Sequence, residues 1–172
     1  MTTKDSVDPS NIYNIDETGF RIRVLAGRVV ITHLSTKAVY LADPDNRESV
    51  TTVETICSNR TTIPPMLILK GEVLLKKFFD NDLENDTLLA VSSSGYSNKE
   101  LAMKYLIHFY NNTFKKTKGR WRMLIFDGHS SHVSVEFLHY CWEHKIIPFQ
   151  LPPHSTHLLQ PLNIGLFQPL KH

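Results

Sequence analysis

The stretch RMLIFDGHSSH, residues 122–132, decides the fold. Its four consecutive apolar residues, 123–126, are typical of a strand that is buried on both faces of an α/β sheet. The run stops at Asp127 and Gly128, so a carboxylate follows the strand at the end where α/β sheets form their binding crevices. Asp127 is therefore a candidate metal ligand. The alternative is that Asp127 only caps a tight turn, as Asp-Gly pairs often do.

Length and composition are those of an ordinary soluble globular domain. The chain has 172 residues and a formal net charge of +2, which allows a sizeable core but gives weak support for a polyanion partner. No apolar run reaches about 18 residues, so we expect no membrane span. The first residues, MTTKDSVDPSN, do not resemble a secretory signal. The two cysteines, Cys57 and Cys141, are too few for a disulfide framework.

A second carboxylate follows a second short strand near the start of the chain. Residues 11–15, NIYNI, predict a strand that delivers Asp16, and we treat residues 1–10 as a tail. Residues 51–57 and 66–69 predict further strands of an antiparallel meander. Shorter β-prone pieces lie at 22–25, 29–32 and 38–41.

Helical patterns alternate with strands in the second half of the chain. Ser97 and Glu100 have the spacing of a capping box, ahead of a helix whose apolar residues recur at a period near 3.6. Ser134 is a candidate N-cap for a second helix with three residues inward, Phe137, Leu138 and Cys141.

The last strand and helix complete a recognisable order of elements. Residues 146–151 predict an edge strand, because Pro148 cannot donate a hydrogen bond, and Pro161 suits the first turn of a final helix over 162–170. The resulting order, β-β-β-α-β-α-β-α, predicts an α/β protein with a ribonuclease H-like fold. We expect a mixed five-stranded sheet with helices on both faces.

In that layout the first strand lies beside strand 122–126, so Asp16 and Asp127 would stand together. Two adjacent carboxylates repel each other unless a cation neutralises them, and hard oxygen ligands favour Mg²⁺ or Mn²⁺. Two such ions can activate a water and stabilise the leaving oxygen of a phosphodiester. This chemistry needs a third carboxylate, which the last helix would supply.

Three ordered motifs resemble the catalytic core of the DDE superfamily endonucleases. They are IYNIDETGF, LIFDGHSSH and LPPHSTHLLQPLNIGLFQPLK, and they are most similar to the pogo-like branch of the mariner transposases, kin to the centromere protein B and jerky-like proteins. The resemblance spans residues 11–171. It implies a ribonuclease H-like fold, two divalent metal ions, hydrolytic DNA strand cleavage and strand transfer by a 3′-hydroxyl.

The resemblance also identifies a departure from the family pattern. The first two family aspartates fall on Asp16 and Asp127, but the third position, in QPLNIG, is Asn163. Asparagine lacks the negative charge and carries an NH₂ donor, and charge count is a main determinant of affinity for hard cations. We therefore expect strand cleavage to be severely weakened. The alternative is a catalytically silent, domesticated or decayed module that binds nucleic acid or another protein.

No acidic residue near position 163 is an obvious substitute. After Asp127 the only acidic residues are Glu136 and Glu143, on the preceding helix. Glu17 adjoins Asp16, but successive strand residues point to opposite faces of a sheet.

The family normally has helix-turn-helix modules ahead of the core, whereas about ten residues precede the first strand here. We therefore expect residues 11–172 to be a catalytic-like domain that is truncated at its C-terminus and lacks such a module. Its DNA binding would then be weak, salt-dependent and unspecific. The resemblance implies a nuclear location, and a homodimer is one assembly to test.

Several residues outside the carboxylate pair are candidate contacts to nucleic acid. The basic cluster, which Arg122 extends, could touch phosphates, act as an import signal or simply be solvated; it comprises Lys115, Lys116, Lys118 and Arg120. His129 and His154 belong to two H-x-x-H pairs, which we interpret as support or phosphate contacts beside Asp127 in preference to zinc ligands. Trp121 and Trp142 could stack on bases, although we favour packing for both.

Overall fold

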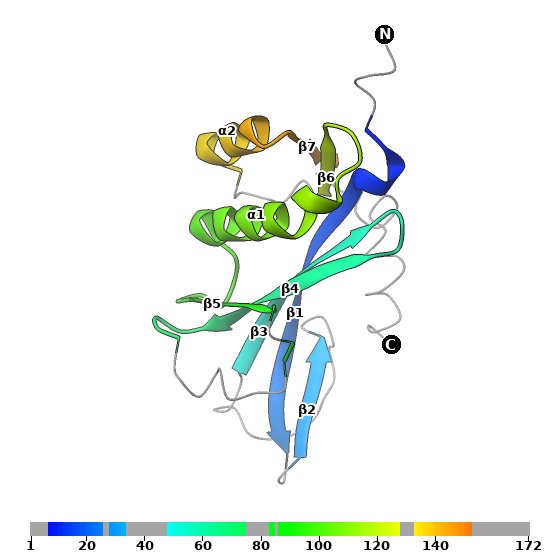
Figure 1. The fold of residues 1–172 in the computed structure, drawn as a ribbon. Helices are drawn as coiled ribbons and strands as arrows, with labels where there is room; N and C mark the ends of the chain where they lie inside the picture. Colours follow the sequence, from blue (N-terminus) through cyan, green and yellow to red (C-terminus); the bar gives the residue numbers. More distant parts are fainter. Residues whose placement is uncertain are drawn as a thin grey trace.

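The protein is built on one long strand, β1 (Ile12–Leu25), shown in blue in Figure 1. The structure is a computed structural model that describes residues 7–25, 28–33, 48–74, 83–84, 86–127 and 133–152. The other elements, in chain order, are a 3₁₀ helix at Pro9–Asn11, β2 (Arg28–His33), β3 (Glu48–Cys57), β4 (Thr62–Lys70), β5 (Leu88–Ser92), α1 (Lys99–Thr113), a second 3₁₀ helix at Phe114–Lys116, β6 (Arg122–Phe126), α2 (Val135–Glu143) and β7 (Ile146–Gln150).

The strands form one mixed sheet in the order β5-β4-β3-β1-β6-β7, with β2 as an additional partner of β1. The pairs β1–β2, β1–β3 and β3–β4 are antiparallel, whereas β1–β6, β4–β5 and β6–β7 are parallel. The predicted mixed sheet is confirmed. It has seven strands where we expected five, because β5 lies in a segment without clear periodicity and β2 pairs with the far half of β1.

One edge of β1 is divided between two neighbouring strands. On the opposite edge β3 pairs continuously with residues 13–22. On the divided edge β6 pairs with residues 12–14, and β2 pairs with residues 20–25. Residues 15–19 therefore pair with neither β6 nor β2, and no other described strand pairs with them on this edge; we call residues 15–19 the open stretch of β1.

Both helices in the described part of the chain cover the same face of the sheet (Figure 1). The ring of Phe109 in α1 meets the ring of Tyr13 edge-on, with 5.0 Å between centroids. Phe137 in α2 contacts Phe126 of β6 in the same manner at 6.3 Å. The final helix that we predict over 162–170 lies outside the described residues, as does the β-prone piece at 38–41.

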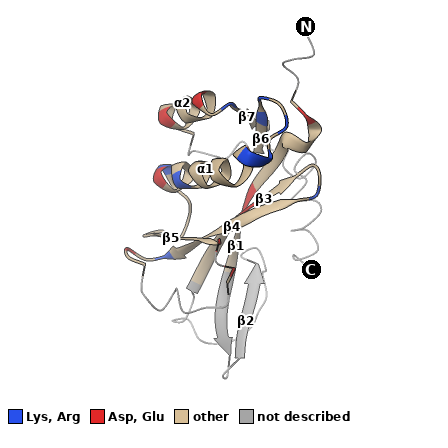
Figure 2. Ribbon diagram, viewed as in Figure 1, with Lys and Arg blue, Asp and Glu red and all other residues tan. Residues whose placement is uncertain are grey.

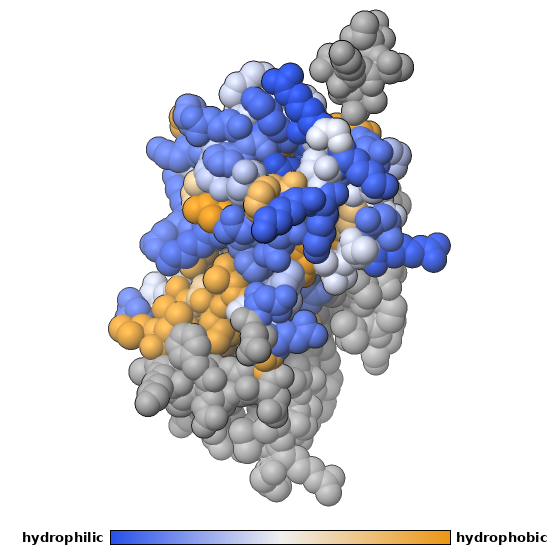
Figure 3. All heavy atoms as spheres, viewed as in Figure 1, coloured by the Kyte–Doolittle hydropathy of each residue, from blue (hydrophilic) through white to orange (hydrophobic). Residues whose placement is uncertain are grey.

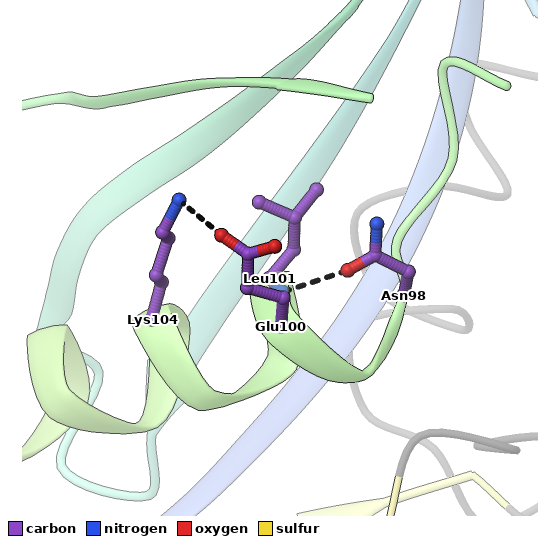
Figure 4. A network of polar contacts seen from close by, with 4 residues as sticks. All are labelled: Asn98, Glu100, Leu101 and Lys104. Atoms are coloured by element: carbon purple, nitrogen blue, oxygen red, sulfur yellow. Dashed lines mark hydrogen bonds and ion pairs between the residues drawn. The ribbon is translucent and has the colours of Figure 1, made fainter. Parts of the chain in front are cut away.

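Helix α1 begins one residue later than the capping box predicts. Asn98 is the N-cap, and its side-chain oxygen accepts a 2.9 Å hydrogen bond from the backbone of Leu101 (Figure 4). Glu100 instead pairs with Lys104, one turn further along the helix, at 2.8 Å (Figure 4). Ser97, which we expected to cap, is buried just before the helix.

The predicted start of α2 is confirmed, but the prediction that Leu138 points inward is wrong. Ser134 is the N-cap and accepts a hydrogen bond from the backbone of Phe137 at 3.2 Å. Phe137 and Cys141 are buried, whereas Leu138 is 46% exposed and Trp142, one turn later, is 69% exposed. These two residues form a second, outer apolar stripe on the helix.

The two edge strands of the described sheet are β7 and β5. β7 ends the sheet beside β6, which confirms the edge position that Pro148 predicts. β5 ends it on the other side, where Figure 3 shows apolar side chains gathered over β5 and the end of β4. Residues 75–82 adjoin this area in the chain and lie outside the described part.

Asn11 fastens the basic loop that precedes β6 to the start of β1. Its side chain is 0% exposed. Its Nδ2 donates hydrogen bonds to the carbonyl oxygens of Lys118 and, at 3.0 Å, of Trp121, while its Oδ1 accepts from the backbone nitrogen of Lys118 at 3.1 Å. One amide therefore satisfies three backbone groups of the loop.

We predict that Asn11→Ala lowers the free energy of unfolding by about 2–3 kcal/mol, because buried backbone groups lose their partners. Urea denaturation measures the change. Asn59→Ala is the matched control: this exposed turn residue accepts hydrogen bonds only from Thr61, and we expect a loss of less than about 1 kcal/mol. Equal losses in the two variants would contradict the anchoring role of Asn11.

Candidate functional site

The parallel pairing of β1 with β6 aligns the two predicted aspartates. The paired residues are Ile12 with Met123, Tyr13 with Leu124 and Asn14 with Ile125. Asp16 and Asp127 each follow the last pair by two residues, so in this register they are opposite each other. Alternation along β1 places Asp16 on the sheet face of Asn14, and Asp127 lies just beyond the end of β6. The structure therefore brings together the two residues that we predicted to be neighbours.

The two aspartates lie where the sheet is open. Asp16 belongs to the stretch 15–19 of β1 that neither β6 nor β2 pairs with, and Asp127 immediately follows β6. Both line one hollow of about 170 Å³, whose other walls are largely apolar residues of α1, β6 and the start of α2.

Backbone contacts hold the two strand ends in place. The Asp16 Oδ1 accepts a 2.9 Å hydrogen bond from the backbone nitrogen of Glu17. Asn14 Nδ2 donates to the carbonyl oxygen of Ile125 across the β1–β6 pair at 3.3 Å, and the backbone nitrogen of Leu151 donates to the Phe126 oxygen at 2.9 Å. These contacts fix the backbone on both sides of the carboxylate pair.

A third carboxylate, that of Glu54, lies beside Asp16, and we did not predict it from the sequence. Glu54 of β3 is the direct antiparallel partner of Asp16, and directly opposite residues on neighbouring strands point to the same face with Cβ atoms about 4.5–5.5 Å apart. Its Oε1 accepts a long 3.5 Å hydrogen bond from the Thr52 hydroxyl. Within the described ranges no lysine or arginine forms an ion pair with it.

Burial raises the pKa of Glu54 above its ordinary value, and the Thr52 hydroxyl only partly opposes this. The ionised carboxylate is therefore less stable in the folded protein than in the unfolded chain. Like charges that are directly opposite each other in a sheet are destabilising, so Glu54 and Asp16 would benefit from a shared cation. The signal in the sequence was the single acidic residue within the alternating strand TTVETIC.

The remaining predicted site residues are separated from this pair or lie outside the described part. Asn163, His129 and His154 all fall outside the described residues, so their placement relative to Asp127 stays a prediction. The basic cluster lies at the other end of β6 from Asp127, on the second 3₁₀ helix and the loop that follows it (Figure 2).

One arginine of the basic stretch is structural. Arg122, the first residue of β6, is 3% exposed. It donates to the Thr113 hydroxyl at 3.0 Å and to the His144 carbonyl oxygen, and its guanidinium lies 5.0 Å from the centre of the Tyr110 ring. It therefore joins the ends of α1 and α2, and only the other four cations of the stretch are exposed to a partner.

Comparison with known proteins agrees with this geometry. The family profile of the DDE superfamily endonucleases matches residues 46–172. The chain belongs to this family. The family resemblance read from the sequence is thereby confirmed, whereas the roles of Asp16 and Asp127 stay a prediction.

Solved structures of a mariner transposase share the fold. The Mos1 strand transfer complex superposes with a TM-score of 0.58 at 15% identity, over 95% of this chain and 41% of that one. The Mos1 mariner paired-end complex with Mn superposes with a TM-score of 0.53 at 14% identity, over 96% of this chain and 42% of that one. The ribonuclease H-like α/β fold is thus confirmed. The chain spans about two-fifths of these transposase chains.

A curated relative shows that the domain also occurs within a much longer protein. This relative, described as the MFS-type transporter clz9 of Cochliobolus lunatus, is 37% identical over 169 residues, which are 98% of this chain and 18% of that protein. The chain spans less than a fifth of it. In the described part of our chain no helix is long and apolar enough to cross a membrane.

We predict that Glu54→Gln stabilises the metal-free protein at neutral pH. Because the pKa of Glu54 is raised in the folded state, its ionised form destabilises folding, and this cost disappears as the pH falls towards the ordinary glutamate pKa of about 4.3. Thermal unfolding in EDTA between pH 4.5 and 8 measures the effect. The gain should shrink steadily towards the acid end.

Glu100→Gln is the control for this prediction. Lys104 lowers the pKa of Glu100 through a hydrogen bond and its charge, so this variant should be slightly less stable than the parent at neutral pH, or equal to it. A Glu54→Gln variant that is destabilised at pH 8 would show that the carboxylate is already compensated without metal.

Proposed function

We propose that this chain is a transposase-type nuclease domain that binds DNA and holds Mg²⁺ or Mn²⁺ at Asp16 and Asp127. The observation that carries the proposal is the β1–β6 register, which aligns these two aspartates at the open stretch of β1. Membership of the DDE superfamily supports a nuclease domain, and the matched residues 46–172 include Asp127. The activity, the metal and the DNA partner are inferred for this chain.

The donor set fits a hard divalent cation. Among the described residues no three His, Cys, Asp or Glu side chains already converge as a metal site. Mg²⁺, however, is usually held by one or two carboxylates together with waters and substrate phosphates. Asp16 and Asp127 supply two carboxylates on one face, and Glu54 lies next to them. A bound metal would supply activation of water and stabilisation of the leaving oxygen.

The protein's own part in the reaction is to position these carboxylates. The hydrogen bond from the Glu17 backbone restrains the Asp16 side chain, and the Asn14 contact to β6 holds the two strands in register. Such pre-organisation matters, because a displacement of about 1 Å can cost about 100-fold in rate.

We further propose that Asn163 weakens strand cleavage without abolishing metal binding. An amide in place of the third carboxylate removes one negative charge from the cation's surroundings. Glu54 supplies a negative charge on the neighbouring strand and partly replaces the missing one for binding. The competing function is a silent nucleic-acid-binding module of domesticated or decayed origin, which the substitution at position 163 favours.

The basic cluster is the surface that we propose for duplex DNA. Its cations are exposed and lie together at one end of the sheet (Figure 2): Lys115, Lys116, Lys118 and Arg120. Contacts of this kind are to phosphates, so binding by this domain should be salt-dependent and unspecific. A DNA-binding transposase domain would act in the nucleus, which is our proposed location. The pogo-like branch remains the proposed subgroup.

We predict that the protein nicks supercoiled plasmid weakly with Mn²⁺ and that Asn163→Asp raises the rate about tenfold or more, which corresponds to about 1.4 kcal/mol in the barrier. Asp127→Asn should remove the activity. Gel analysis of nicked plasmid, with EDTA as the blank, measures the rates. If the parent chain nicks DNA as well as the Asn163→Asp variant does, the proposed weakening is wrong.

Metal binding is measured separately from cleavage, by electron paramagnetic resonance of free Mn²⁺ during titration. We expect Asp16→Asn and Asp127→Asn to weaken binding strongly, and Glu54→Gln to weaken it about three- to tenfold, since charge count sets the affinity of such sites. Glu100→Gln is the matched control and should bind like the parent. Unchanged Mn²⁺ affinity in Asp127→Asn would refute the site.

A further inference from the structure

Both tryptophans of the chain lie side by side on the surface, at the end of β6 remote from Asp127. Their ring centroids are 5.8 Å apart. Trp142, near the end of α2, is 69% exposed, which contradicts our expectation of core or half-buried packing, whereas Trp121 is half-buried as expected. With Ile146, Ile147 and Pro148 the two rings line a hollow of about 370 Å³ beside the edge strand β7. We call the two rings and their hollow the tryptophan patch.

Cations surround the tryptophan patch. The Nζ of Lys145 lies 5.5 Å from the ring centre of Trp121 and 6.0 Å from that of Trp142. The guanidinium of Arg120 lies 5.6 Å from the centre of the Trp121 ring. The basic cluster continues from Arg120 along the preceding loop. The acidic neighbour is Glu143, whose Oε2 lies 3.6 Å from Nδ1 of His139.

Lys145 occupies a backbone position where glycine is preferred. Its φ is +58°, in the left-handed region that follows a helix C-terminus and that glycine usually fills without strain. Its backbone nitrogen donates a hydrogen bond to the Trp142 carbonyl oxygen at 3.3 Å, and its carbonyl oxygen accepts one from the Arg122 backbone nitrogen at 3.0 Å. Non-glycine residues in such positions cluster at functional sites. Here the strained residue is the one whose ammonium group lies over both rings.

We propose that the tryptophan patch binds unpaired nucleotides of single-stranded DNA. An exposed aromatic ring bordered by cations stacks a base and neutralises its phosphates, a combination used for single strands because every base has a π-face. Bases in a closed duplex are not free to stack on a side chain. The patch therefore complements the exposed basic cluster, whose cations suit the phosphates of a duplex.

The proposal shares DNA as ligand with the proposed function but needs neither metal nor cleavage. Trp121 precedes β6 and Asp127 follows it, so the patch and the carboxylates stand at opposite ends of one strand. Binding is therefore tested in EDTA with the full chain. Failure of cleavage would leave this proposal standing, and failure of single-strand binding would leave the carboxylate site standing.

The experiment measures quenching of intrinsic tryptophan fluorescence, since both tryptophans belong to the patch, together with anisotropy of a fluorescein-labelled 15-mer of thymidine. We expect single-stranded DNA to quench the emission and Trp142→Ala to weaken its binding about 5- to 150-fold, the range for loss of one base-stacking ring. Trp142→Phe should recover most of the affinity. Val135→Ala, an equally exposed apolar residue at the other end of α2, should bind like the parent.

An abasic strand of equal length and charge separates stacking from electrostatics. We expect it to bind the parent and the Trp142→Ala variant equally, and more weakly than thymidine binds the parent. Lys145→Gly should weaken binding while the melting temperature stays equal or rises, because glycine removes the backbone strain. That combination excludes misfolding as the cause.

Two results would overturn the proposal. One is equal loss of affinity for thymidine, abasic and duplex DNA in Trp142→Ala, which would reduce the patch to part of a general basic surface. The other is unchanged DNA binding together with loss of a dimer in sedimentation, which would assign the hollow to a second copy of this chain.

Discussion

The parallel pairing of residues 12–14 of β1 with residues 123–125 of β6 is the contact on which the rest of the structure depends. This register aligns Asp16 with Asp127, two residues beyond the last pair. At the other end Asn11 binds the backbone of Lys118 and Trp121 and so fixes the loop that carries the cations. A slip of one residue would turn one aspartate to the opposite face. The buried Asn14 side chain, bonded to the Ile125 carbonyl, opposes such a slip.

The carboxylate end of this arrangement is electrostatically unfavourable when no cation is present. Asp16 and Glu54 are direct partners across β1 and β3, and Asp127 aligns with Asp16 on the other edge. A sheet selected only for stability would place opposite charges or apolar residues there. Burial adds a separate cost, because it raises the pKa of Glu54 above its ordinary value. The direct pairing of Asp16 with Glu54, with Asp127 just beyond the end of β6, is better explained by a ligand than by folding.

Strands and helices that a local residue pattern specifies could be predicted from the sequence. Features that depend on which strands pair, and in which register, could not. The run 123–126 followed by Asp127 identified the central strand, and its likeness to residues 11–16 identified the partner. The role of Glu54 depends on the β1–β3 register, which no local pattern encodes. In α2 two apolar stripes adjoin, one with Phe137 and Cys141 and one with Leu138 and Trp142. Sequence periodicity does not show which of the two stripes faces the sheet. The contact between Phe137 and Phe126 of the sheet shows that the Phe137 stripe does.

The length of β6 sets the spacing between the two surfaces. Asp127 follows Trp121 by six positions, a rise of about 20 Å at about 3.3 Å per strand residue. A stacked nucleic-acid strand advances about 3.4 Å per nucleotide, so a strand that reached both ends would span about six nucleotides. The cations lie at the tryptophan end and the acidic side chains at the other, so only the phosphate next to Asp127 would approach a negative surface. At that phosphate a divalent cation is needed before DNA and carboxylates can come into contact.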